Sequence, residues 1–303
     1  MKTHPHHSSA PARKFRVTHG SHFKLSDYNP ADKVDALSEK KHKHAIKQNL
    51  KALRDLQELL YADNTWALLL VFQGMDAAGK DGTIKHVMRG VNPQGCDVVS
   101  FKQPSREELS HDFLWRCARS LPPSGRIGIF NRSHYEEVLV ARVHPRILEA
   151  QRLPAACRPS GPKDEKRFWA GRYESITAFE RHLARNGVKI LKFFLHISPD
   201  EQRRRLLARL DEKEKNWKFE PSDLAERAHW DKYQAAYEDM IKHTSTPEAP
   251  WFVVPADDKT RARYVVGSAI IDALRAMNLA TPKVTPEQSA NLQKARKILQ
   301  KKN

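Results

Sequence analysis

The chain has 303 residues, of which 53 are Lys or Arg and 36 are Asp or Glu, so its formal net charge is +17. A surplus of this size indicates a polyanionic partner: nucleic acid, an anionic membrane or a phosphorylated substrate. No run approaches 18 uninterrupted apolar residues, which excludes a membrane-spanning helix, and three widely spaced cysteines argue against a disulfide framework or a zinc site. The polar start of the sequence does not resemble a secretory signal, so we expect a cytoplasmic protein.

The elements predicted along the chain alternate between helices and short strands. Residues 1–33 are polar and basic, and predict an extended N-terminal arm, whereas apolar residues recur at helical spacing over 35–61. Five apolar runs follow, separated by charged helical stretches: "WALLLVFQG", "CDVVSF", "RIGIFN", "VKILKFFLHIS" and "PWFVVPAD". This alternation predicts an α/β fold with a five-stranded parallel sheet flanked by helices. We expect one domain over 34–280 and a basic C-terminal helix over 281–303, which begins at the capping sequence "TPEQ".

The first predicted strand leads into "GMDAAGKDG", which has the G-x-x-x-x-G-K spacing of a phosphate-binding loop. The spacing alone is weak, because it arises by chance in about one chain of this length in ten. Its position between a strand and a helix is a stronger signal, since such a loop aims backbone N–H groups and a helix N-terminus at an anion. We predict phosphate contacts for Gly74, Ala77, Ala78, Gly79, Lys80 and Asp81.

Two acids in this loop need an explanation, because negative phosphates must approach it. Asp81 occupies the position where a phosphate loop normally carries the Ser or Thr that contacts magnesium. Asp76, inside the loop, makes physical sense if it holds Mg²⁺ or orients an attacking phosphate oxygen. We therefore predict a catalytic and metal-binding role for Asp76, while Asp81 is either a second contact or a favourable partner of the helix dipole.

Further polar residues follow the predicted strands, whose carboxyl ends form the ligand-binding edge of such a sheet. Lys102 and Asn131 emerge at this edge, and Arg116 lies on the helix after Lys102. We predict that Lys102 and Arg116 contact the nucleotide or its phosphate, although Arg116 can also form an ordinary pair with Asp112. Arg132 can grip a phosphate in a bidentate manner, the alternative being a buried salt bridge to an acid such as Asp76 or Glu137.

The sequence "SPDEQRRRLLARLDEKEKNWKF" crowds four arginines into seven residues. Arg205 and Arg209 are four apart and share a helix face. A strip of like charges costs self-repulsion unless anions compensate it, so we predict that both residues belong to a lid at about 203–232 that closes on phosphates. Trp217 is predicted to be a packing anchor.

Several longer blocks of the sequence resemble the polyphosphate kinase 2 family. They are "LLLVFQGMDAAGKDGTIKHVMRGVNPQGCDVVSFKQPS", "HDFLWR", "GRIGIFNRSHYEEVLVARVHP", "NWKF" and "TSTPEAPWFVVPADDK", and the resemblance covers about residues 35–280. It implies a P-loop kinase fold similar to thymidylate kinase, with a helical lid. It also implies magnesium-dependent transfer of the terminal phosphoryl group of inorganic polyphosphate to a nucleotide, and a homo-oligomer, either a dimer or a tetramer.

The resemblance also suggests a subtype. Family members that act mainly on nucleoside diphosphates tend to have Asp in an F-D-R-S pattern, whereas this chain has Asn131 in "FNRSHYEEVLV" and resembles the subtype that accepts AMP and ADP. Asn131 brings no charge to magnesium, so Glu136 and Glu137 are candidates to complete the metal site. Neighbouring helical residues point about 100° apart, so one of the two is expected to face the site. We predict that Glu137 is the metal ligand, because an acid occurs at this position in similar sequences.

The leading hypothesis is therefore a reversible, Mg²⁺-dependent transfer from polyphosphate to AMP and ADP that gives ADP and ATP. Phosphoryl transfer needs mainly positioning and charge neutralisation from the protein. An ATP-dependent nucleotide kinase on the same fold is one alternative, but it leaves the net charge of +17 unexplained. A nucleic-acid-binding P-loop protein is another, yet the aromatic residues lack the interleaving of RNA-binding motifs, so no nucleic-acid partner is expected.

Overall fold

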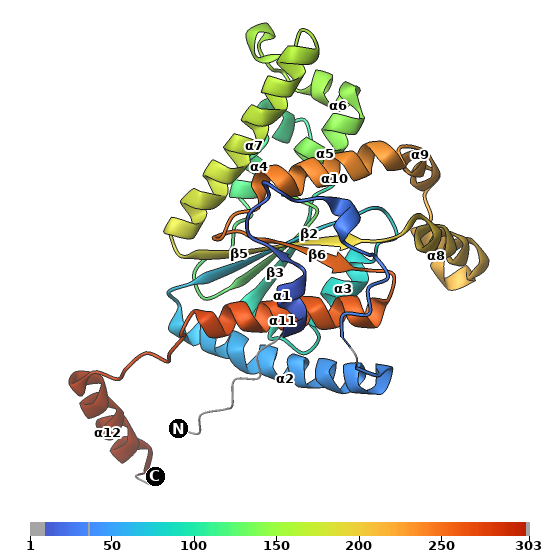
Figure 1. The fold of residues 1–303 in the computed structure, drawn as a ribbon. Coiled ribbons are helices and arrows are strands. Elements are labelled where there is room, and N and C mark those ends of the chain that lie inside the picture. The colour runs from blue at the N-terminus through green and yellow to red at the C-terminus, as the bar shows by residue number, and fades with distance from the viewer. Residues whose placement is uncertain (1–9, 36, 301–303) are drawn as a thin grey trace.

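The computed structural model describes residues 10–35 and 37–300, so the first nine residues of the predicted arm lie outside it. The described chain forms a six-stranded sheet with the strand order β1-β6-β5-β2-β4-β3 (Figure 1). The strands are β1 Arg16–Val17, β2 Ala67–Gln73, β3 Cys96–Ser100, β4 Ile127–Asn131, β5 Val188–His196 and β6 Trp251–Pro255. Strands β2 to β6 are parallel, as predicted, and the sheet is mixed because β1 pairs antiparallel with β6.

Helices cover both faces of this sheet. Helix α2 packs against α11, which also contacts α1 and α3 on one face, while α5, α7 and α10 pack together on the other (Figure 1). Strands β2, β4, β5 and β6 are largely buried, as every residue of β2 shows, whereas the edge strand β3 is mostly exposed or half-buried. The helices are α1 Ala10–Lys14, α2 Glu39–Asp63, α3 Lys80–Val87, α4 Trp115–Ala118, α5 Glu136–Val143, α6 Pro145–Ala150, α7 Pro162–Arg185, α8 Pro199–Asp211, α9 Ser222–Ala228, α10 Trp230–Thr244, α11 Lys259–Ala276 and α12 Pro286–Gln300.

The N-terminal segment differs from the extended arm predicted for residues 1–33. After the short helix α1, β1 adds to the edge of the sheet, and Phe15, Val17, Phe23 and Leu25 are buried. The prediction was wrong for this part because isolated apolar residues, without a helical or strand period, can still insert into a core formed by distant parts of the chain.

The C-terminal helix α12 projects from the body of the protein (Figure 1). All of its residues are exposed, including Leu292, Ile298 and Leu299, which line the apolar stripe seen in the sequence. None of the described helices combines the length and the apolar character needed to cross a membrane.

The segment predicted as a lid contains α8, the 3₁₀ turn Lys213–Lys218 and α9, which lie together beside the carboxyl ends of the strands (Figure 1). Ser198 caps α8 by accepting a hydrogen bond from the backbone N–H of Glu201, and Pro199 is its first residue. Trp217 is 78% exposed, so the prediction that it anchors packing is wrong: the turn that carries it extends past the edge of the core.

Candidate phosphoryl-transfer site

The loop between β2 and α3 has the strand–loop–helix geometry predicted from the glycine spacing. Gly74 and Gly79 have φ values of 155° and 100°, in the region that favours glycine, and a Cβ on Gly74 would lie 2.9 Å from the carbonyl oxygen of Leu195. Ala77 also has a positive φ, of 62°. The loop therefore needs glycine at its first position because the backbone of β5 passes directly behind it.

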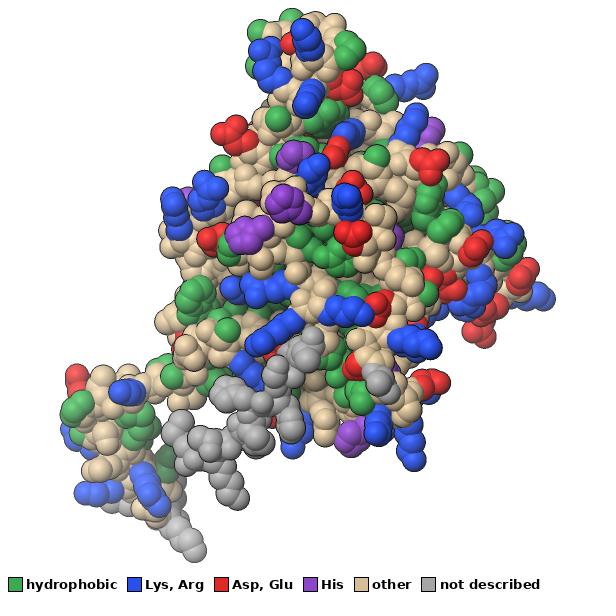
Figure 2. Space-filling model, viewed as in Figure 1, with side chains coloured by type: hydrophobic (Ala, Val, Ile, Leu, Met, Phe, Trp, Pro, Cys, Tyr) green, Lys and Arg blue, Asp and Glu red, His purple; other side chains and the backbone are tan. Residues whose placement is uncertain are grey.

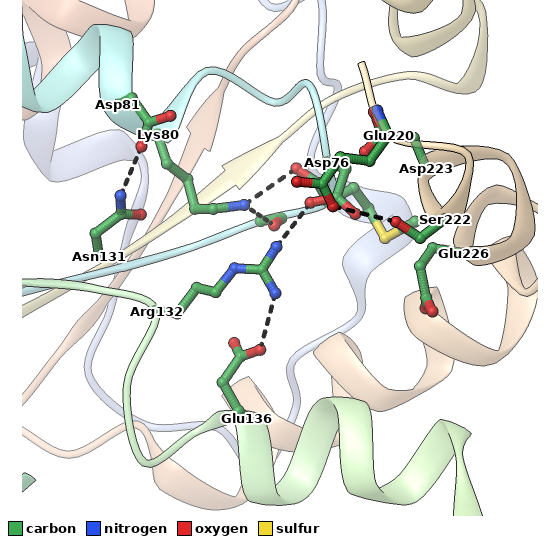
Figure 3. A network of polar contacts seen from close by, with 12 residues as sticks. Asp76, Lys80, Asp81, Asn131, Arg132, Glu136, Glu220, Ser222, Asp223 and Glu226 are labelled. Atoms are coloured by element: carbon green, nitrogen blue, oxygen red, sulfur yellow. Dashed lines mark hydrogen bonds and ion pairs between the residues drawn. The ribbon is translucent and has the colours of Figure 1, made fainter. Parts of the chain in front are cut away.

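Lys80 folds back over this loop. Its Nζ donates to the backbone carbonyls of Gly74, at 2.6 Å, and Met75, at 3.3 Å (Figure 3). Burial and the nearby Arg132 lower the pKa of Lys80, while the surrounding carboxylates oppose this shift. The ammonium group thus lies at the centre of the loop, where a phosphate group would replace the carbonyls as its partner.

Arg132 connects the loop with the helix that follows β4. Its guanidinium group donates to Asp76 Oδ1 at 2.8 Å and to Glu136 Oε2 at 3.3 Å (Figure 3). The carboxylate of Glu136, followed by that of Asp76, raises the pKa of Arg132. The ion pair with Asp76 was one of the two alternatives open from the sequence. The side chain of Arg132 remains 40% exposed, so it is accessible to a phosphate as well.

Asn131 lies on the other side of the loop. Its Nδ2 donates to Asp81 Oδ1 at 2.6 Å (Figure 3). The same Nδ2 lies 3.4 Å from Ser100 Oγ. The loop and the end of β4 are therefore joined by two polar links, from Asn131 to Asp81 and from Arg132 to Asp76. The carboxylate of Asp81 thus points toward Asn131 and away from Asp76 (Figure 3).

Glu137 does not lie where the sequence analysis placed it. Its carboxylate is buried, 3.2 Å from Arg172 Nε, and accepts a hydrogen bond of 2.6 Å from Gln151. Burial raises the pKa of Glu137, against the opposing charge of Arg172. The prediction that Glu137 faces the phosphate loop as a metal ligand is wrong, because α5 turns Glu136 to that side and Glu137 toward α7.

The two lid arginines are also bound differently from the prediction. Arg205 is 7% exposed and donates to backbone carbonyls of the phosphate loop and of the segment after β6, so its donors are used by groups of the protein itself. Arg209 forms a 2.8 Å ion pair with Asp223 of α9. Arginines that appear as a charged strip in the sequence are therefore used within the fold: Arg205 binds distant backbone carbonyls and Glu201 of its own helix, and Arg209 pairs with Asp223 of α9.

A cavity of about 290 Å³ beside the end of β4 is lined by one of the two predicted nucleotide contacts. Arg116 lines this cavity, and its Nη1 donates to the backbone carbonyl of Lys102 at 2.8 Å. Lys102 itself is exposed. The other residues that matter for the cavity's chemistry are Phe113, Ser133, His134, Glu137, Gln151 and Arg172.

A buried charge network that the sequence analysis missed supports the segment after Arg132. Lys192, in the middle of β5, is 0% exposed and donates to Glu180 at 2.6 Å and to the hydroxyl of Tyr135 at 2.9 Å. Tyr135 in turn donates to Glu180. A lysine inside the apolar run "VKILKFFLH" was the signal, since a charge within a buried strand requires a partner.

The residues fit a magnesium ion held jointly with phosphate. Among the described residues, no three His, Cys, Asp or Glu side chains form a cluster able to hold a metal by themselves. Mg²⁺ is usually bound by one or two carboxylates together with substrate phosphates and water, which does not need such a cluster. Asp76, whose side chain is 25% exposed beside the loop, has the required carboxylate.

The fold and this site define a P-loop phosphotransferase. The family model "Polyphosphate kinase 2 (PPK2)" matches residues 36–282, and the chain belongs to the polyphosphate kinase 2 family. It is 50% identical over 291 residues to an ADP-polyphosphate phosphotransferase of Rhodopseudomonas palustris, with 95% of this chain and 98% of the relative covered.

Two further comparisons agree with this assignment. An AMP/ADP-polyphosphate phosphotransferase of Meiothermus ruber is 43% identical over 272 residues, which cover 89% of this chain and 95% of the relative. The crystal structure of polyphosphate kinase 2 from Arthrobacter aurescens TC1 superposes with a TM-score of 0.83 at 39% identity, covering 95% of this chain and 97% of that one.

Proposed function

We propose that this protein transfers the terminal phosphoryl group of inorganic polyphosphate to AMP and ADP, giving ADP and ATP reversibly. The observation that carries the proposal is the meeting of the Lys80 loop with Arg132 at the carboxyl ends of β2 and β4. Membership of the family supports the reaction, and relatives named for ADP alone and for AMP and ADP support these acceptors. Asn131, in the position discussed for the AMP-accepting subtype, supports AMP as well.

The residues of the site act through charge and position. The loop N–H groups and Lys80 bind one phosphate, and Arg132 turns from its two carboxylates to grip the phosphoryl group in transfer. The attacking phosphate oxygen of AMP or ADP is already ionised, so the protein does not need to remove a proton. When bound, Mg²⁺ neutralises charge on the phosphate oxygens, and Asp76 is the residue that would hold it.

The cavity beside Ser133 is suited to the nucleoside part of the acceptor. Phe113 lines the cavity with the guanidinium group of Arg172 over one face of its ring, and Arg116 adds a second cation to the lining. The buried Glu137 and the half-buried Gln151 provide hydrogen-bonding groups for the edge of the base. Ser133, which lines the cavity, directly follows Arg132 in the chain, and this supports an acceptor position next to the phosphate loop.

The experiment that tests the function is ATP formation from AMP, long-chain polyphosphate and Mg²⁺ without added ATP, with Lys80→Ala as control. ATP from the wild type alone supports both phosphorylation steps and the role of the loop. ADP alone restricts the enzyme to AMP. If neither product forms, the assay is repeated with ADP as acceptor. Failure there as well, together with activity when ATP is the donor, would identify an ATP-dependent nucleotide kinase instead.

The proposal includes two features that rest on the family resemblance and on the substrates. Polyphosphate and nucleotides as substrates favour a cytoplasmic location, and related enzymes favour a homo-oligomer, either a dimer or a tetramer. Light scattering of the purified full-length protein gives the oligomeric mass directly, and a monomeric mass at micromolar concentration would contradict this part.

A further inference from the structure

Arg205 connects helix α8 of the lid segment to the phosphate loop by hydrogen bonds. Its Nη1 donates to the carbonyls of Ala77, at 3.1 Å, and Ala78, at 2.9 Å. Its Nη2 donates to two carbonyls after β6, those of Ala256 at 2.6 Å and Asp257 at 3.1 Å. The remaining donor, Nε, is 2.6 Å from Glu201. All five N–H groups of a guanidinium are therefore used within the protein, and none is left for a phosphate.

Gln202, also on α8, adds a second link to the same loop. It is 1% exposed, and its Nε2 donates to the backbone carbonyl of Asp76 at 3.0 Å. Its Oε1 accepts a 2.6 Å hydrogen bond from Arg227 of α9. Two neighbouring side chains of α8 thus hold three successive loop carbonyls, from Asp76 to Ala78, and one of them also connects the loop to α9.

This arrangement has a direct consequence for the loop. A loop that binds phosphate must turn its N–H groups inward, and its carbonyls then point outward, where they need donors. Arg205 and Gln202 supply those donors from behind. Ala77, at the centre of the held segment, has a positive φ of 62°, which an alanine rarely adopts, so the loop conformation depends on support from its surroundings.

We propose that Arg205 and Gln202 are positioning residues for phosphoryl transfer, which fix the phosphate loop in its anion-receiving shape and couple that shape to the lid. They act through Asp76, Ala77 and Ala78 and do not touch the substrate. Because Gln202 binds both Asp76 and Arg227, the position of Asp76 is coupled to the position of α9. The expected effect on catalysis rests on the proposed function. The hydrogen bonds from Arg205 and Gln202 to the loop carbonyls, called the clamp below, are a property of the protein alone.

The first test compares Arg205→Lys with Arg204→Lys in the full-length protein. Arg204 directly precedes Arg205 on α8, has a 68% exposed side chain and pairs with Glu201 alone, so it is a matched control. We expect Arg205→Lys to speed amide exchange at least tenfold in the loop peptide over residues 74–84. We also expect it to lower kcat about 30-fold and to leave the KM for polyphosphate within about threefold. Arg204→Lys should leave all three unchanged.

The opposite result identifies a direct contact with the substrate. In that case the KM for polyphosphate rises, and the slope of log KM against log salt falls by about one. Amide exchange in the loop then stays as in the wild type. Such a pattern overturns the proposal. If Arg205→Lys does not fold, Gln202→Met replaces it, because it removes the links to Asp76 and Arg227 with little change in side-chain volume. Unchanged loop exchange in Gln202→Met would then overturn the proposal.

The two parts of the experiment separate this proposal from the proposed function. If the wild-type protein forms no product from polyphosphate, the proposed function fails, and amide exchange in the loop still decides whether the clamp exists. If the wild type is active and the loop of Arg205→Lys exchanges faster without any loss of kcat, the clamp exists but does not position the reaction, and the proposal is wrong.

Discussion

The guanidinium group of Arg132 lies between the carboxylates of Asp76 and Glu136, which a substrate phosphate would replace. Whether the reaction needs its two-pronged contact can be tested by substitution with lysine. We expect Arg132→Lys to lower kcat/KM about 100-fold, or about 2.7 kcal/mol, because an ammonium group cannot form the same bidentate contact with the transferred phosphoryl group. The melting temperature should change little, because partly exposed ion pairs contribute about 0–1 kcal/mol. Steady-state kinetics with AMP and polyphosphate measures the effect.

Arg126→Lys is the control for this substitution. Arg126 also pairs with one carboxylate, that of Asp97 at 3.0 Å, but it lies at the opposite ends of the strands. It should retain wild-type kinetics. Equal losses in both variants would show that Arg132 has no special part in the reaction.

Glu136 and Glu137 are neighbours in sequence with different surroundings, so the same substitution should have different effects. Glu136→Gln weakens the hold on Arg132, and we expect kcat to fall about tenfold with the KM for AMP nearly unchanged. Glu137→Gln weakens the buried pair with Arg172, and we expect a higher KM for AMP and a lower melting temperature. Kinetics and thermal unfolding of both variants check this, and the reverse pattern would show that Glu137 is the residue that acts at the phosphate.

His196, at the end of β5, gives the protein a specific dependence on pH. Burial lowers its pKa to about 4, below the ordinary value of 6.5. As the pH falls below 6.5, the imidazole of His196 binds a proton in the unfolded chain but stays neutral in the folded protein. The free energy of unfolding is therefore unaffected by this group above pH 6.5 and decreases as the pH falls toward 4. Between pH 7 and pH 5 the wild type should lose about 2 kcal/mol more than His196→Gln. Urea unfolding at both pH values measures the difference, and equal losses would contradict it.

At the scale of elements, the N-terminal segment and α12 form an informative pair, because both lie outside the parallel part of the sheet. Phe15 is 3% exposed, next to β1, whereas Leu299 on α12 is 85% exposed. We expect Phe15→Ala to cost about 3–5 kcal/mol of unfolding free energy and Leu299→Ala to cost less than about 0.5 kcal/mol. Denaturant unfolding of both variants tests this, and similar costs would show that α12 also packs on the protein.

The elements with a regular apolar period were predictable from the sequence. The five parallel strands follow from runs such as "WALLLVFQG", and the loop with Lys80 follows from its glycine spacing between a strand and a helix. Asp76 and Arg132 were predictable as neighbours because parallel strands end at the same edge. The family and its reaction followed from the longer sequence blocks.

The rest depends on contacts that no local pattern reveals. Which of Glu136 and Glu137 faces the loop depends on the rotation of α5, and that is set by packing against α7 and α10. Arg205 carried a correct signal, a charge that needs partners, but its partners are carbonyls about 50 and 130 residues away in the chain. A charge pattern alone does not distinguish a phosphate from a backbone carbonyl as the acceptor.

At the scale of the whole molecule, Lys and Arg side chains are spread over the face shown in Figure 2, consistent with the net charge of +17. Two of the predicted phosphate contacts, Arg205 and Arg209, are paired with Glu201 and Asp223 inside the fold, so they add no net charge for polyanion binding. The charge that attracts a long polyphosphate chain must then come from many exposed side chains acting together.

This reasoning predicts a dependence on both salt and chain length. A long polyanion displaces counterions in proportion to the charges it neutralises, so the KM for long-chain polyphosphate should rise at least about tenfold between 50 and 200 mM KCl. Tripolyphosphate is short enough to occupy only the surroundings of the loop, and its KM should rise much less over the same range. The slopes of log KM against log salt for the two donors are the measurement. Equal slopes would show that the phosphate loop and its neighbours account for all the charge that the donor meets, and that the basic surface has no part in holding the chain.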